Sequence, residues 1–192
     1  METYKNIATF YAKNQRAWRN WLKKNHLNET AVWLIIYKKD SGIPSVYYSE
    51  AVDEALCFGW IDSKPNKRDD LSYYQYFSRR NPKSNWSRVN KLKVEKLIRE
   101  GKMENAGMEM IQLAQSNGSW NALNAVEELV IPTEMEQLFQ QNVSALENWN
   151  KFPKSAKRGI LEWIRNAKRP ETKLKRITET VQLAAQNRRA NY

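Results

Sequence analysis

The most apolar stretch of this 192-residue chain is Ala31–Tyr37, which is seven residues long. A helix that crosses a membrane needs about 20 apolar residues, so the sequence predicts no membrane span. The stretch is rich in β-branched and aromatic residues, which favour a buried β-strand. We therefore expect a sheet in the N-terminal part of the chain.

The segments around this strand predict a mixture of strands and helices. Leu71–Phe77 has the composition of a further strand, and Trp60–Asp62 leads into an extended stretch, whereas the polar residues 63–70 predict a loop. The expected helices cover residues 6–26, 49–58, 86–100 and 104–117. Because strands and helices do not alternate as in βαβ units, we expect an α+β domain over residues 1–120, with a small antiparallel sheet and packed helices.

From Thr133 onward the chain has only helical periodicity. Thr133 and Glu136 have the spacing of a capping box, in which each side chain accepts a hydrogen bond from the other residue's backbone N–H. The expected helices cover residues 133–141, 144–151, 155–168 and 171–187. We therefore expect an all-helical C-terminal region over residues 121–192, packed on the first domain.

The net charge of +11 is unevenly distributed. Residues 1–100 and 151–192 are basic, whereas residues 101–150 contain one basic and seven acidic side chains. Such an asymmetry indicates distinct faces or modules rather than a uniform polycation. The basic C-terminal helices are expected either to contact anionic lipid or nucleic acid, or to pack against the acidic segment.

Residues 64–99 contain eleven Lys and Arg side chains. The aromatic residues among them are Tyr73, Tyr74, Tyr76, Phe77 and Trp86. Positive charge that binds phosphates, together with aromatic faces that stack on bases, is typical of a nucleic-acid-binding surface. The alternative, which we favour, is a solvated helix face with the aromatic side chains in the core, because no recognised nucleic-acid-binding motif accompanies the charge.

A candidate anion site lies where the last expected strand leads into the helix 86–100. Its residues are Arg79, Arg80, Ser84, Trp86, Ser87 and Asn90. A helix N-terminus offers unpaired N–H groups and a positive dipole end, and two arginines converging there would bind phosphate or carboxylate. In the alternative, the serines are ordinary N-caps, Trp86 is in the core, and the arginines pair with acidic residues. Those acidic residues are Asp62, Asp69 and Asp70.

A second candidate is a pocket wall made of Phe58, Gly59, Trp60 and Asp62. Glycine permits close backbone approach, tryptophan offers a flat apolar surface, and the carboxylate is an acceptor. In the alternative, Phe58 is core, Gly59 ends a helix, and Asp62 forms a local cap or pair.

The sequence lacks the patterns of common catalytic and metal sites. Cys57 is the only cysteine and His26 the only histidine, so the usual zinc ligand set and a Cys–His nucleophile are not predicted. No dinucleotide-binding, P-loop or serine-nucleophile motif is present. We therefore expect no metal, no cofactor and no catalytic residue. An enzyme acting on a small anionic substrate at the candidate anion site is kept as an alternative.

The first ten residues contain no basic start followed by an apolar run, so the sequence predicts no secretory signal. The unpaired thiol of Cys57 suits a reducing compartment, and apolar neighbours are expected to make it inert. We therefore expect a cytoplasmic protein.

Several short strings, taken together in their order and spacing, resemble the YdeI/OmpD-associated, or bacteriocin-protection, family. In the N-terminal part they are Glu54–Asp62, Phe77–Arg80, Ser84–Asn90, Gly101–Met103, Ala106–Met108 and Gly118–Trp120. In the C-terminal part they are Lys157–Ile164, Ala167–Lys168, Glu171–Thr172 and Arg176–Ile177. The resemblance covers residues 33 to 183 and implies a small cytoplasmic bacterial protein linked to protection from bacteriocins or cationic peptides. It implies no catalytic residue set.

These observations together predict a non-catalytic protein that binds an unidentified protein partner or a small anionic ligand. Nucleic-acid binding through residues 64–99 and the basic C-terminal helices is the alternative.

Overall fold

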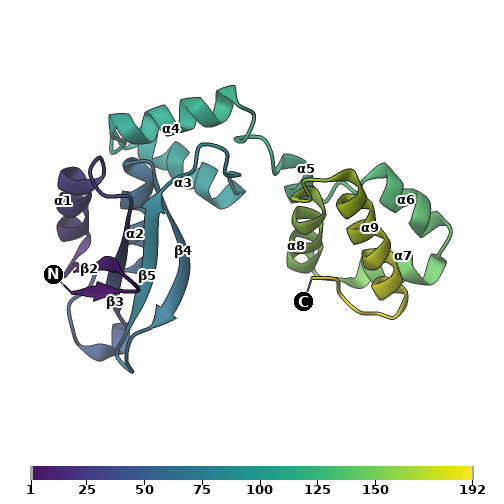
Figure 1. Cartoon of the computed structure of the whole chain (residues 1–192), viewed down its shortest axis with the longest axis horizontal. Coiled ribbons are helices and arrows are strands. Elements are labelled where there is room, and N and C mark those ends of the chain that lie inside the picture. Colours follow the sequence, from purple (N-terminus) through teal and green to yellow (C-terminus); the bar gives the residue numbers. More distant parts are fainter. Residues whose placement is uncertain (1, 192) are drawn as a thin grey trace. The chain divides into compact units, whose positions relative to one another are not determined.

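A computed structural model describes residues 2–191 of the chain (Figure 1). The chain divides into two compact units, of which the first ends at Asn121 and the second starts at Ala122. The first unit contains a sheet with helices, and the second contains only helices, so the expected α+β class with an all-helical C-terminal region is confirmed. No helix of the described residues is both long enough and apolar enough to cross a membrane.

The sheet of the first unit has five strands in the order β1-β2-β3-β5-β4. Their bounds are β1 Thr3–Tyr4, β2 Ile7–Tyr11, β3 Ala31–Tyr37, β4 Trp60–Lys67 and β5 Ser72–Arg79. β2 pairs with β3 in parallel, and the other neighbours are antiparallel. The predicted antiparallel sheet is therefore wrong at one pairing, because helix α1 (Gln15–Asn25) connects β2 to β3 and returns the chain in the same direction.

Two segments differ from their predicted structure. Residues 7–11 form β2 rather than the first turns of a helix, and α1 begins only after Asn14, whose side chain accepts a hydrogen bond from the backbone N–H of Ala17 at 2.9 Å. The polar segment predicted as a loop is β4 as far as Lys67. A strand at the edge of a sheet is mostly exposed, so polar side chains are compatible with it.

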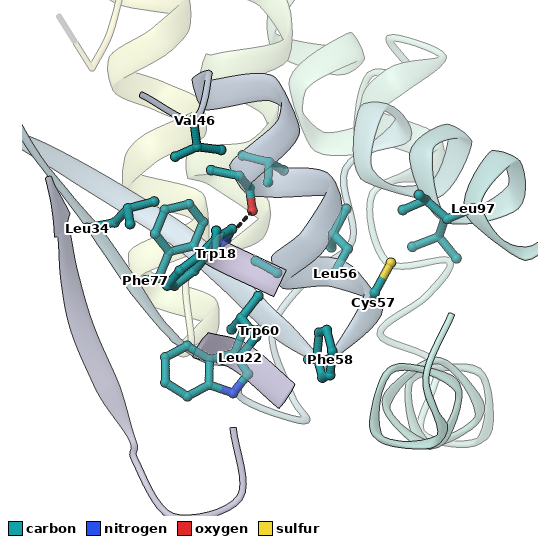
Figure 2. Packing of buried hydrophobic residues seen from close by; sticks show 14 of the residues in the cluster. Trp18, Leu22, Leu34, Val46, Leu56, Cys57, Phe58, Trp60, Phe77 and Leu97 are labelled. Atoms are coloured by element: carbon teal, nitrogen blue, oxygen red, sulfur yellow. Dashed lines mark hydrogen bonds between the residues drawn. The ribbon is translucent and has the colours of Figure 1, made fainter. Parts of the chain in front are cut away.

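The main core of the first unit lies between one face of the sheet and its helices. Trp18 and Leu22 of α1 pack with Leu34 of β3 and Phe77 of β5, and all four are fully buried. The Trp18 ring nitrogen donates a 3.0 Å hydrogen bond to the carbonyl of Ala51 in α2 (Tyr48–Cys57), as Figure 2 shows. The bond satisfies the one polar atom of the indole, so the side chain is buried without an unpaired donor.

Helices α3 (Arg88–Arg99) and α4 (Asn105–Ser116) complete this core. Gly107 of α4 lies so close to α2 that an added Cβ would be 2.3 Å from the carbonyl oxygen of Cys57. Glycine at this position is therefore what allows the two helices to approach each other.

The opposite face of the sheet carries a separate cluster of aromatic side chains. Trp33 of β3 and Tyr74 of β5 are buried there, and Tyr4 stacks on Tyr74 with ring centroids 4.2 Å apart. The alternation of side chains along each strand places these residues on the face away from Leu34 and Phe77.

The second unit is a bundle of helices with its own core. The bounds are α5 Asn124–Glu127, α6 Thr133–Gln140, α7 Val143–Lys151, α8 Lys154–Arg165 and α9 Pro170–Ala185. Met135, Phe139 and Trp149 are buried with apolar residues of α8 and α9. The predicted capping box at Thr133 is wrong, because Pro132 holds the N-cap position and its side chain accepts no hydrogen bond.

Two ion pairs join the acidic segment to the basic helices within this unit. Arg158 lies 3.1 Å from Glu127, and Lys173 lies 3.2 Å from Glu134. The pairs support the expectation that the basic helices pack against the acidic segment. Because solvent screens exposed charges, these pairs contribute little to stability.

Candidate functional site

The two arginines expected to converge on one anion point to different surroundings. Arg79 is exposed, and it donates from Nε to the carbonyl of Glu29 at 2.8 Å and from Nη2 to the carbonyl of Leu27. Arg80 is buried, and its guanidinium lies 3.7 Å from the ring centroid of Trp86. Arg79 is the last residue of β5 and Arg80 follows it directly, yet their side chains contact different parts of the first unit, so the predicted convergence is wrong.

Arg79 instead lines a cavity of about 230 Å³ together with Phe58, Gly59 and Trp60, which are three of the four predicted wall residues. His26, at the end of α1, also lines the cavity, as do Glu109 and Met110 of α4. Phe58 and Trp60 are almost fully buried, so they are wall and not mobile surface (Figure 2). Four segments that are distant in the sequence therefore form one concave site.

The turn at Gly59 shapes this cavity. Gly59 joins α2 to β4 with a φ of 72°, a backbone conformation that glycine adopts without strain. An added Cβ would lie 2.9 Å from the carbonyl oxygen of Ala106, so the absence of a side chain lets α4 approach. Trp60 is fixed by a 3.3 Å hydrogen bond from its ring nitrogen to the carbonyl of His26.

Asp62, the fourth predicted wall residue, is not among the residues that line this cavity. Its Oδ2 accepts a 2.6 Å hydrogen bond from the hydroxyl of Tyr48. Burial raises the pKa of Tyr48, and the neighbouring carboxylate raises it further. The alternative interpretation, in which Asp62 has a local partner, therefore holds, and that partner is Tyr48.

Arg80 is 4% exposed, and only one of its nitrogens has a partner. Nη2 donates a 2.5 Å hydrogen bond to the carbonyl of Asn85, whereas Nε and Nη1 have no hydrogen-bond partner among residues 2–191. Burial lowers the pKa of Arg80 to about 10, and the charge of Asp62 partly opposes this shift. The cation is stacked on Trp86, and no carboxylate of residues 2–191 forms an ion pair with it.

The other predicted anion ligands are engaged locally. The Ser87 side chain caps α3 by accepting a 3.3 Å hydrogen bond from the N–H of Asn90, and the Ser84 hydroxyl donates to the carbonyl of Asn81 at 2.8 Å. The alternative of ordinary N-capping therefore holds for Ser87. The alternative in which the two arginines pair with acidic residues does not hold among residues 2–191. Asp69 accepts from Arg68 and Ser72, Asp70 pairs with Lys67, and Asp62 accepts from Tyr48.

A buried polar cluster on α1 and α2 was not predicted. Glu54 is 4% exposed and accepts hydrogen bonds of 2.7 Å from both Gln15 and Arg19, and Arg19 also lies 2.6 Å from Glu104. The sequence contains a signal for this cluster: Glu54 lies within the apolar stripe of α2, and a buried carboxylate needs polar partners. Cys57 is buried beside it, and burial raises the pKa of the thiol to about 11, as an inert cysteine requires.

The described residues contain no group of three or more His, Cys, Asp or Glu side chains placed to hold a metal ion. Residues 10–110, more than half of the chain, match a family model described as a domain of unknown function, DUF8412. The chain belongs to the DUF8412 family. All residues that line the cavity lie within this match except Leu113 of α4.

A second match covers residues 128–187 with the family model described as Bacteriocin-protection, YdeI or OmpD-Associated. The resemblance is thus confirmed for the C-terminal helices, while the N-terminal strings on which it also rested, as far as Met108, fall in the DUF8412 domain. No curated protein and no solved structure matches the chain significantly.

Proposed function

We propose that this chain is a non-catalytic member of the bacteriocin-protection family that binds a small anionic ligand in the cavity of its DUF8412 domain. One observation supports this most strongly: a concave site with buried aromatic walls has an arginine at its edge. Apolar walls with a few fixed polar groups are the usual composition of a ligand site.

Arg79 is oriented by neutral groups, so its charge remains available. Its partners are the backbone carbonyls of Leu27 and Glu29, which fix the guanidinium without neutralising it. A guanidinium has five N–H donors, and those that remain can bind a carboxylate or a phosphate.

The dimensions and charges of the cavity limit the ligand. A volume of about 230 Å³ is below the roughly 300–1,000 Å³ of typical drug-sized sites, so the ligand is small. Glu109 lies on the same wall as a like charge for an anion, which weakens binding without preventing it. The His26 ring is bound through Nδ1 to the carbonyl of Leu22 at 2.9 Å, which fixes the orientation of the ring and does not involve Nε2.

Calorimetric titration of the full chain with benzoate, phenyl phosphate and neutral benzyl alcohol tests the proposal. We expect the two anions to bind more tightly than the alcohol. Arg79→Gln should weaken anion binding by roughly tenfold, because a charged hydrogen bond is lost. Glu109→Gln should tighten it by about two- to fivefold, because a like charge is removed. Lys83→Gln, an exposed change elsewhere, is the control.

Equal affinity for benzoate and benzyl alcohol, or unchanged binding in both variants, would overturn the proposal. The Glu109 variant distinguishes a loss of binding from a folding defect, because unfolding cannot increase the affinity for an anion. The protective role is tested separately: a strain lacking the gene should become sensitive to bacteriocin, and wild type, but not Arg79→Gln, should restore resistance.

Nucleic-acid binding has less support from the aromatic side chains than the sequence suggested. Tyr74, Phe77 and Trp86 are buried, so three of the five expected stacking faces are in the interior. Positive charge alone supplies affinity for phosphates without base contacts.

A further inference from the structure

The second unit contains two hollows that share Lys173. The first, which we call the apolar hollow, has a volume of about 280 Å³ and lies between α5, the segment after it, and α8. The second, the basic hollow, has a volume of about 320 Å³ and lies at the turn from α8 to α9. Because Lys173 lines both, the two hollows adjoin each other.

The apolar hollow has a buried hydrocarbon floor. Val126, Leu161 and Ile164 line it and are almost fully buried, while Val130 stands at its edge with 54% of its surface exposed. An exposed valine beside a hydrocarbon-lined depression has unfavourable contact with water that an apolar ligand would remove.

Cationic side chains line the apolar hollow and the adjoining basic hollow. Arg165 lines the apolar hollow, is exposed, and has no ion-pair partner among residues 2–191. Lys168 and Arg169 line the basic hollow, and both are exposed. Of these four cations, only Lys173 has an ion-pair partner among residues 2–191, and that partner, Glu134, also lines the basic hollow.

We propose that the two hollows together form a binding site for a small anionic amphiphile, a single hydrocarbon chain with one acidic headgroup. The apolar hollow takes the chain, and the cations at the shared boundary take the headgroup. A free inorganic anion would leave the hydrocarbon floor exposed, and a neutral hydrocarbon would leave Arg165, Lys168 and Arg169 without an ion-pair partner. The site is in the other unit from the Arg79 cavity, so it stands independently of the proposed function.

Titration of the full chain with decanoate, below the concentration at which it forms micelles, tests this site. We expect decanoate to bind more tightly than decanol, acetate and inorganic phosphate. Octanoate should bind roughly tenfold more weakly than decanoate, since each buried methylene contributes to affinity.

Two variants and their matched controls locate the site. Val130→Asp should weaken decanoate binding at least about fivefold by placing a like charge beside the apolar hollow. Val143→Asp is its control, because Val143 is also an exposed valine of this unit, at the start of α7. Arg165→Gln should weaken binding about three- to tenfold, whereas Lys154→Gln, at an exposed position on the same helix, should not.

Equal loss in Val130→Asp and Val143→Asp, or phosphate binding as tight as that of decanoate, would overturn the inference. The first result would mean general electrostatic attraction, and the second a plain anion site. Benzoate binding that depends on Arg79 would be unaffected by either result, so the two proposals fail separately.

Discussion

Arg80 is a buried cation whose two unpaired donors distinguish it from the other arginines described above. Taking a charge out of water costs several kcal/mol unless a partner compensates. Stacking on Trp86 recovers part of this, since cation–π contacts contribute about 0.5–2 kcal/mol. The buried charge of Arg80 is therefore expected to lower the free energy of unfolding, unlike the charge of a stabilising salt bridge.

Replacing Arg80 by methionine should leave the free energy of unfolding unchanged or raise it by up to about 2 kcal/mol at pH 7, because a similar volume is kept and the charge is removed. Arg80→Ala should lower it, because a void forms beside Trp86. Denaturant unfolding measures both. A loss of more than about 2 kcal/mol in the methionine variant would identify the cation as a net stabiliser.

The same group has a pH signature. Burial lowers the pKa of Arg80 from its ordinary value to about 10, so at pH 7 the cost is fully present. As the pH rises through 10, the folded state releases the proton first and this cost declines. The advantage of the methionine variant over wild type should therefore shrink between pH 9 and 11, as the same unfolding experiment would record.

At the scale of elements, the packing of α4 on α2 depends on Gly107. Helix propensity alone predicts that Gly→Ala within a helix stabilises by up to about 1 kcal/mol. Here the new Cβ would be 2.3 Å from the carbonyl oxygen of Cys57, and backbone cannot rotate away. Gly107→Ala should therefore destabilise by about 1–3 kcal/mol, as measured by chemical unfolding.

Gly118→Ala is the comparison for this variant. Gly118 has a φ of 80°, but an added Cβ meets no atom within 4 Å. Gly118→Ala should therefore lower the free energy of unfolding only by the backbone strain, about 1 kcal/mol. If Gly107→Ala were instead stabilising, the close contact between α2 and α4 would be wrong.

The elements with strong local signals were predictable, and those set by tertiary pairing were not. β3 was predictable from its continuous apolar residues, and α9 from its helical periodicity. β2 was not, because Phe10 fits a helical stripe with Ala17 as well as a strand, and only pairing with β3 decides between them. Phe58 and Trp60 were predictable as cavity wall because they are aromatic residues beside a glycine. Glu109 was not predictable, because only the packing of α4 in the folded unit brings it to the cavity.

For the whole molecule, the two units have separate cores. The buried apolar residues of the second unit run from Leu123 to Ala190 and pack with one another. We expect residues 122–192, expressed alone, to be helical by circular dichroism and to unfold cooperatively, because the unit retains its complete core. The full chain, measured alongside as the reference, should show the same helical signal plus that of the first unit. A fragment without helical signal would show that the second unit depends on the first.

β4 forms the outer border of the sheet, and its composition affects how copies of the chain meet. Pro65, beside an irregularity in the pairing with β5, has no N–H to offer an incoming strand. Lys64 and Lys67 are both exposed on the same strand and repel a second copy aligned with it. The polar residues of β4, which led to its prediction as a loop, therefore also oppose aggregation by the addition of a further strand.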